Sequence, residues 1–132
     1  MIVATKITPY QQIGGQQAVL TLVEKFYINM DTFPQASGIR KMHAEKLDSA
    51  KQKLFKFLSG WLGGPDLFVQ EFGHPRLKMR HFPFAIGPLE RDQWVLCMQQ
   101  ALREIEMDAT LRESLNQAFY DLASHMINRA NN

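Results

Sequence analysis

The chain has 132 residues, of which 45% are hydrophobic and 11% aromatic, and its formal net charge is +2. A chain of this length is expected to form one domain, 1–132, around a single core. The apolar content argues against disorder, because disordered chains carry far fewer apolar residues. A small basic excess does not by itself indicate a nucleic-acid or membrane partner.

The cysteine content and the N-terminal sequence indicate where in the cell the protein is expected. Cys97 is the only cysteine, which excludes an intrachain disulfide and a C-x-x-C-H haem attachment, and we expect it to be a small buried apolar side chain. The start, MIVATKITPYQQ, lacks the charged region and apolar run of a signal peptide. No stretch approaches the ~18 apolar residues of a membrane-spanning helix, so a reducing, cytoplasmic location is predicted.

Four segments repeat apolar residues at the three- and four-residue spacing of amphipathic helices. The expected helices are 16–30, 46–62, 89–107 and 108–130, and strand-like alternation is absent, so the sequence predicts an all-α fold. In chain order, their apolar faces consist of Val19, Val23, Phe26, Tyr27 and Met30; Leu47, Ala50, Leu54, Phe57, Leu58 and Trp61; Trp94, Met98, Ala101, Leu102 and Ile105; and Leu111, Leu115, Ala118, Phe119, Leu122 and Met126.

Glycine and proline separate these segments. The Gly-Gly pair at 14–15 and the Gly-Gly-Pro run at 63–65 allow sharp turns, and 33–38 separates the first long helix from the second. Pro88 is suited to the first turn of the third helix. The stretch 65–88 is the least regular part of the chain.

Within this irregular stretch, GHPRLKMRHFPFAIGP (73–88) places His81 between cations and aromatic residues. Pro75 is suited to start a short helix, and Pro83 disfavours helical geometry in the residue before it, so we expect about two turns that end near His81. Leu77 and His81 then lie one turn apart on the same side. A ring N–H there can donate to a carbonyl of the preceding turn, which leaves the other nitrogen available to a metal.

From the residues alone, His81 is open to four interpretations: a nucleic-acid contact, a catalytic base, a metal ligand or a structural side chain. His43, His74 and His125 lack the spacing of a metal cluster, and one histidine cannot build a zinc site, which needs about four ligands. A lone histidine beside apolar side chains suits haem iron, because the macrocycle supplies the other ligands.

Cations near the histidine suit the same interpretation. Haem propionates are anions that need cations at the pocket edge, and Arg76, Arg80 and Lys53 are the candidates. The alternative is that these are solvated surface charges. A haem-free helical module could also use the 76–80 patch for acidic or nucleic-acid partners, although no recognised nucleic-acid motif supports this.

One combination of motifs spans nearly the whole chain: Phe26-Tyr27, the two glycine pairs, GHPRLKMRHFPFAIG, and ERDQW, which ends at Trp94. This combination resembles the truncated haemoglobins, specifically their second group. The resemblance implies a two-over-two helical sandwich around non-covalent haem b. It also implies a shortened first helix and a loop-rich segment on the side of the iron-ligating histidine.

The resemblance implies a role for four residues. His81 corresponds to the proximal iron ligand. On the opposite, distal side, Tyr27 and Trp94 match the family's tyrosine and pocket tryptophan, and His43 falls where relatives carry tyrosine, histidine or phenylalanine. All three are expected to stabilise the ligand by donating hydrogen bonds, whereas His74 and His125 are expected outside the site.

Further residues are expected to contact haem. Ala50 and Leu54 match the family's distal-helix positions beside the ligand, and Ala50 departs from ordinary globins, which usually have a histidine there. The full set of expected haem contacts is Lys53, Leu54, Phe57, Phe68, Leu77, Arg80, Phe84, Ile86 and Trp94.

The implied function is reversible binding of diatomic ligands, above all oxygen, with nitric oxide and carbon monoxide as others. A hydrogen bond contributes ~1 kcal/mol, or ~1.5–3 to a charged group, so two donors would slow oxygen release by orders of magnitude. Slow release suits a scavenger, a sensor or a redox enzyme. The enzymatic alternative is conversion of nitric oxide to nitrate, or reduction of peroxide or peroxynitrite, with a reductase partner that the sequence does not identify.

Overall fold

The computed structural model describes residues 7–130, and every regular element in that range is helical. The predicted all-α fold is therefore confirmed. None of these helices is long and apolar enough to cross a membrane. The first six residues, part of the N-terminus interpreted above as lacking a signal peptide, lie outside the described range. In chain order the elements are α1 (Pro9–Ile13), α2 (Gly15–Thr32), the 3-10 helix η1 (Pro34–Ala36), α3 (Ser37–Lys41), α4 (Asp48–Trp61), α5 (Leu67–Phe72), α6 (Leu77–Arg80), α7 (Pro88–Arg103) and α8 (Ala109–His125).

The long helices α2, α4, α7 and α8 confirm the four predicted segments, and local signals set where they begin. Pro88 occupies the first turn of α7, and the Glu90 carboxylate accepts the N–H of Gly87 at 2.7 Å. The Asp108 carboxylate accepts two N–H groups of the first turn of α8. These bonds satisfy backbone donors that have no partner within the helix.

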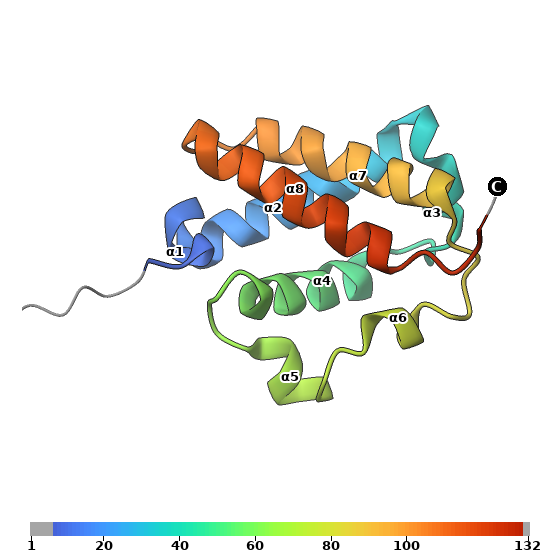
Figure 1. Cartoon of the computed structure of the whole chain (residues 1–132), viewed down its shortest axis with the longest axis horizontal. Coiled ribbons are helices and arrows are strands. Elements are labelled where there is room, and N and C mark those ends of the chain that lie inside the picture. The colour runs from blue at the N-terminus through green and yellow to red at the C-terminus, as the bar shows by residue number, and fades with distance from the viewer. Residues whose placement is uncertain (1–6, 131–132) are drawn as a thin grey trace, which may run out of the picture.

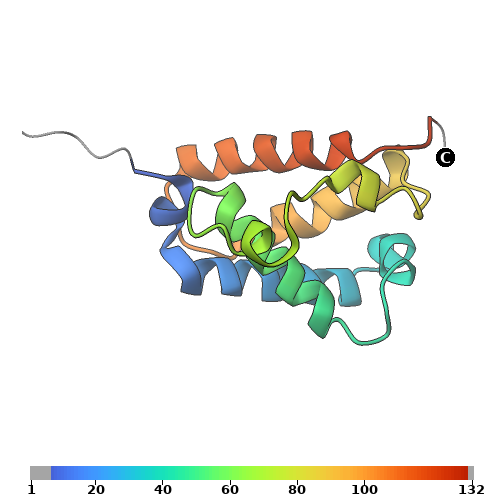
Figure 2. The ribbon, with the colours of Figure 1, turned by 90° about the horizontal axis from the view of Figure 1, so that it is seen from below.

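The long helices form two antiparallel pairs. In Figure 1, α7 and α8 run side by side, with α2 behind them and α4 below. Figure 2 shows α4 crossing in front of α2, while α8 lies along the opposite edge. The helices α2 and α4 thus form one pair and α7 and α8 the other, with α5 and α6 beside α4. This is the two-over-two arrangement.

The apolar faces of α2 and α4 are buried to different degrees. The face of α2 is closed off by its neighbours, and Val19, Leu22 and Phe26 are 0% exposed. In contrast, Leu54, Phe57 and Trp61 of α4 are only partly buried, although they occupy the same kind of stripe. The apolar face of α4 therefore borders a cavity as well as the core.

The second glycine pair makes room for α1. A Cβ added at Gly64 would lie 2.5 Å from the Tyr10 ring, and one added at Gly63 would lie 2.9 Å from Thr8. Gly63 also has φ 94°, which L side chains rarely adopt. The Tyr10 N–H donates to the Leu62 carbonyl at 2.9 Å, which fixes α1 against the end of α4.

The segment before His81 differs from its prediction. Helix α6 begins at Leu77 rather than Pro75 and makes about one turn instead of two. The physical reason is Arg76, whose left-handed backbone (φ 44°, ψ 51°) separates Pro75 from the helix. The stretches 33–38 and 65–72, expected as irregular, also contain short helices: η1, the start of α3, and α5.

Candidate functional site

A cavity of about 570 Å³ lies between α2, α4, α6, α7 and α8. This volume is within the ~300–1,000 Å³ typical of small-molecule and cofactor sites. The cavity brings together side chains that are up to 99 positions apart in the chain, from Tyr27 to Met126. The residues expected at the site that line it are Tyr27, His43, Ala50, Lys53, Leu54, Phe57, Phe68, Leu77, Arg80, His81, Phe84, Ile86 and Trp94.

His81 caps the C-terminal end of α6, and its ring is fixed by the preceding turn. Nδ1 lies 2.6 Å from the Leu77 carbonyl oxygen. Because a carbonyl only accepts, Nδ1 carries the proton in this bond, and Nε2 of the neutral ring carries the lone pair. The predicted bond from the ring N–H to the preceding turn is therefore confirmed, and it leaves Nε2 as the nitrogen suited to a metal.

Tyr27 is buried on α2, so its hydroxyl does not reach the surface. The residue is 5% exposed, and its ring packs edge-on against Phe26 with centroids 4.9 Å apart. Its hydroxyl donates to the Ala50 carbonyl at 3.4 Å, at the long limit for a hydrogen bond. Burial raises the pKa of the Tyr27 hydroxyl, which therefore remains a donor. Such a weak bond leaves this donor easily redirected towards a ligand.

Trp94 contributes a second hydrogen-bond donor, its indole N–H, to the part of the cavity wall that contains Tyr27. Its ring packs against Phe26 and Phe119, with centroids 5.0 and 5.8 Å away. Among residues 7–130, no group accepts a hydrogen bond from the Trp94 indole N–H. The ring is therefore held by aromatic packing alone, and its N–H is available to a ligand in the cavity.

His43 follows α3 and lines the cavity near Tyr27, with ring centroids 5.8 Å apart. Its Nδ1 lies 2.8 Å from the Ile39 carbonyl oxygen, so Nδ1 is again the protonated nitrogen. Burial is the largest cause that lowers the pKa of His43; the charges of Arg40 and His81 also lower it, against the opposing bond to Ile39. In its neutral form His43 therefore presents Nε2 as an acceptor, rather than the donor expected from the sequence.

Comparison with known proteins places the chain in a family. The model of the bacterial-like globin family matches residues 8–128. The chain belongs to this family. It is 33% identical over 121 residues to the group 2 truncated hemoglobin YjbI of Bacillus subtilis, covering 92% of this chain and 89% of the relative.

Solved structures agree with this assignment. The cold-adapted truncated hemoglobin of Pseudoalteromonas haloplanktis TAC125 has 48% identity and a TM-score of 0.91, covering 93% of this globin and 99% of that chain. The group II 2-on-2 hemoglobin of Agrobacterium tumefaciens has 41% identity and a TM-score of 0.90, covering 96% and 98%. The resemblance to the second group of truncated haemoglobins is confirmed, and with it the two-over-two fold.

Globins are haem proteins that bind oxygen-type gases, so family membership implies haem binding. The cavity of this globin suits that group. Its walls are largely apolar, His81 contributes an imidazole with an available Nε2, and cationic side chains line it as well. Haem needs all three: apolar walls for the macrocycle, one axial ligand and cations for the propionates.

The cations of the globin cavity are not equivalent. Lys53 is exposed at the edge. Arg80 also lines the cavity, but its Nε donates to the Pro75 carbonyl at 2.5 Å and its guanidinium stacks over Phe68 at 5.3 Å. Arg76 does not line the cavity; it lies in a separate groove with Trp61, so its expected place at the pocket edge is wrong.

Arg91 is a cation that the sequence analysis missed. It lines the cavity from α7, where its Nη1 donates to the Ser124 hydroxyl at 3.0 Å and its guanidinium stacks over Tyr120. Leu122 and Met126 continue the apolar stripe of α8 that the sequence predicts, and both line the cavity. Periodicity alone could not separate core from cavity wall, because both require apolar side chains.

The remaining chemically active side chains lie outside the cavity. His74 and His125 are exposed and do not line the cavity. Cys97 is 0% exposed, and burial raises the pKa of its thiol to about 11, so the prediction of a small buried apolar residue is confirmed. Within residues 7–130, no group of three or more histidine, cysteine, aspartate or glutamate side chains could hold a metal ion.

Proposed function

We propose that this globin binds haem b non-covalently with His81 as the proximal iron ligand, and that it binds oxygen and other diatomic ligands in the same cavity. One observation carries the proposal: the His81 ring, with its Nδ1–H held by the Leu77 carbonyl, faces a largely apolar cavity of about 570 Å³. When bound, haem supplies an iron with a coordination position for a gas ligand. The single, buried cysteine supports non-covalent attachment.

Tyr27 and Trp94, on the other side of the cavity from His81, would hold the gas ligand. The Tyr27 hydroxyl keeps its proton and needs to give up only a 3.4 Å bond to Ala50. The Trp94 N–H has no competing acceptor among the described residues. Each donor would add ~1 kcal/mol, or ~1.5–3 if the ligand carries charge, so together they favour slow release. Slow release suits scavenging or redox chemistry better than bulk transport.

His43 would act differently from the two donors. Its neutral Nε2 can accept a hydrogen bond or coordinate a metal, because its only ring proton is on Nδ1. We therefore propose an iron that is pentacoordinate or switchable, with His43 or the Tyr27 oxygen as the optional sixth ligand. Nitric oxide and carbon monoxide would occupy the same position as oxygen. The single cysteine, which allows no intrachain disulfide, fits the cytoplasmic location that we propose.

A second candidate function is nitric oxide dioxygenation, or reduction of peroxide or peroxynitrite. Tyr27 and Trp94 favour it, because the donors that hold oxygen also polarise an oxygen–oxygen bond. Turnover would require an external reductase to return the iron to the ferrous state. A haem-free binding module remains the competing proposal of another class.

Titration of the haem-free protein with haemin tests the first proposal. We expect saturable binding at one haem per chain and a Soret band, with a Soret shift when carbon monoxide is added to the ferrous protein. A titration in which the spectrum stays the sum of free haemin and protein, without saturation, would contradict the proposal and favour the haem-free module.

Stopped-flow mixing of the oxygenated protein with nitric oxide separates the two haem-based functions. The measurement is made with and without a flavin reductase and its nicotinamide donor. Repeated recovery of the oxygenated spectrum would select the dioxygenase, whereas a single stoichiometric oxidation would select the binder.

A further inference from the structure

Asn128, three residues after α8, connects the C-terminal segment to the loop that follows His81. Its Oδ1 accepts the N–H of Ile86 at 2.9 Å. Its Nδ2 donates to the Phe84 carbonyl at 2.9 Å and to the His81 carbonyl at 3.2 Å. One amide side chain therefore uses its acceptor and both donor positions on three backbone groups of the same loop.

The backbone of this segment reinforces the connection. The Asn128 N–H donates to the Ile86 carbonyl at 2.7 Å, and the Arg129 N–H donates to the same oxygen at 3.0 Å. Ile86 is thus paired through both its N–H and its C=O. The loop is closed against the chain after α8 by a cluster of hydrogen bonds rather than by packing alone.

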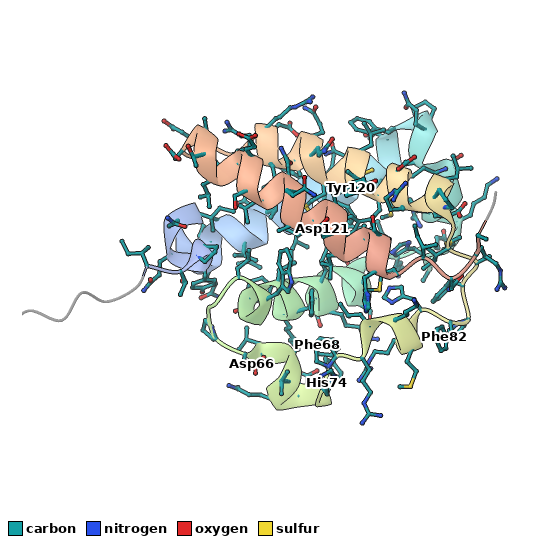
Figure 3. All side chains as sticks on the ribbon, viewed as in Figure 1. Asp66, Phe68, His74, Phe82, Tyr120 and Asp121 are labelled. Carbon is teal, nitrogen blue, oxygen red and sulfur yellow. The ribbon has the colours of Figure 1, made fainter. Side chains whose placement is uncertain are left out.

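Apart from these bonds, the segment that carries His81 is held mainly by contacts with its own neighbours in the chain: Arg80 bonds to the Pro75 carbonyl and stacks over Phe68, and the Phe84 N–H donates to the His81 carbonyl at 2.9 Å. Helix α6 is a single turn without a buried residue, and such short helices are not stable by themselves. Pro83 prevents the helix from continuing. Phe82 is 58% exposed and Phe84 is 40% exposed, so the two aromatic residues that follow His81 do not anchor the loop in the core. Figure 3 shows Phe82 at the outer edge of the molecule, beyond the end of α6.

We propose that Asn128 is a positioning residue for His81: its amide fixes the His81 carbonyl, and with it the direction in which the imidazole Nε2 points into the cavity. The inference rests on the proposed role of His81 as the iron ligand. Nothing in the sequence singles out Asn128, because a single polar residue after a helix usually satisfies only its own turn.

The chemistry of the amide allows its functions to be separated. Asn128→Asp keeps an acceptor for the Ile86 N–H but loses both donors, and it places a carboxylate beside the carbonyls of His81 and Phe84. Asn128→Ala removes all three side-chain bonds. Asn29→Ala is the control, because Asn29 is a buried amide that likewise donates to a backbone carbonyl, that of Cys97 at 3.0 Å, away from α6.

The experiment compares the haem-loaded wild type with these three variants. The readouts are the iron–histidine stretching band in the resonance Raman spectrum of the ferrous, ligand-free protein, the rate of haem transfer to an excess of an acceptor apoglobin, and the thermal unfolding midpoint. We expect both Asn128 variants to shift or broaden the iron–histidine band and to lose haem about tenfold faster, as expected for the loss of one or two net hydrogen bonds. Asn29→Ala should lower the unfolding midpoint and leave the band unchanged.

The possible failures are distinguishable. If the wild type has no iron–histidine band, the proposed ligation by His81 fails. If the wild type has the band and both Asn128 variants keep it unchanged, Asn128 only completes the end of α8, and the inference is overturned even if the variants unfold earlier. Should Asn128→Ala fail to fold, Asn128→Asp alone decides, because its retained acceptor preserves the bond to Ile86.

Discussion

The two histidines of the cavity form the same local hydrogen bond in different surroundings. His43 bonds through Nδ1 to the Ile39 carbonyl at 2.8 Å, and His81 bonds through Nδ1 to the Leu77 carbonyl at 2.6 Å. In each case the histidine follows a short helix, and the carbonyl belongs to that helix, four residues earlier. Ile39, however, is 5% exposed and belongs to the core, whereas α6 contributes no buried residue.

The difference indicates how each wall is held in place. The wall with His43 and Tyr27 rests on α2 and on Ile39, whose side chains belong to the buried core, so burial fixes it. The segment with His81 rests on hydrogen bonds from α6, Asn128 and the backbone of Ile86. Changes near His43 should therefore mainly lower global stability, while changes near His81 should mainly alter haem binding.

The largest expected effect is that of His81→Ala. Removing the proposed iron ligand should reduce haem retention by more than the ~10–100-fold that loss of an outer-shell partner costs. Haem transfer to an acceptor globin measures this loss. His125→Ala is the control, since His125 is exposed and outside the cavity, and it should behave as wild type. Equal retention in both variants would remove His81 from the site.

The second-largest expected effect is on oxygen dissociation, through the two proposed hydrogen-bond donors, Tyr27 and Trp94. Replacing both Tyr27 and Trp94 by phenylalanine should accelerate oxygen dissociation by about 10–100-fold or more, because two hydrogen bonds to the ligand are lost. Stopped-flow displacement of oxygen by carbon monoxide gives the rate. Tyr120→Phe, on the exposed face of α8, is the matched control. Unchanged rates in the double variant would exclude these residues as donors.

The third effect tests how the Gln93 side chain holds α3 in place. The Gln93 amide oxygen accepts the N–H of Ile39 at 3.0 Å, and a Cβ at Gly38 would lie 2.8 Å from that oxygen. Gln93→Ala should cost about 1–3 kcal/mol in unfolding free energy, because it leaves a buried N–H unpaired. Gly38→Ala should displace the same amide, so the double variant should be no less stable than Gln93→Ala alone. Additive losses in urea unfolding would show that the two positions act independently.

The smallest effect is a pH dependence from His43. Because the fold lowers the pKa of His43, the unfolded chain binds more protons, and stability falls as the pH drops below the unfolded value of ~6.5. The glutamine of His43→Gln can still donate to Ile39 but does not titrate. Its unfolding free energy should therefore decline less steeply than that of the wild type between about pH 7.5 and 5.5. Parallel curves would show that His43 does not contribute.

The sequence by itself determined the four long helices and the hydrogen bond of the His81 ring. The three- and four-residue spacing determined the four long helices, because an apolar stripe on a helix must be buried. The bond from the His81 ring to the preceding turn was also predictable, because it joins residues four apart in one short segment. Both depend only on contacts that are local in the chain.

Only the tertiary structure decided which apolar stripe faces a cavity, and that Arg91 lines the site while Arg76 does not. The same holds for Asn128, which contacts residues 42 to 47 positions earlier. These features arise where segments distant in the chain meet, and an apolar or amide side chain has the same local pattern whether it meets the core, a cavity or a loop.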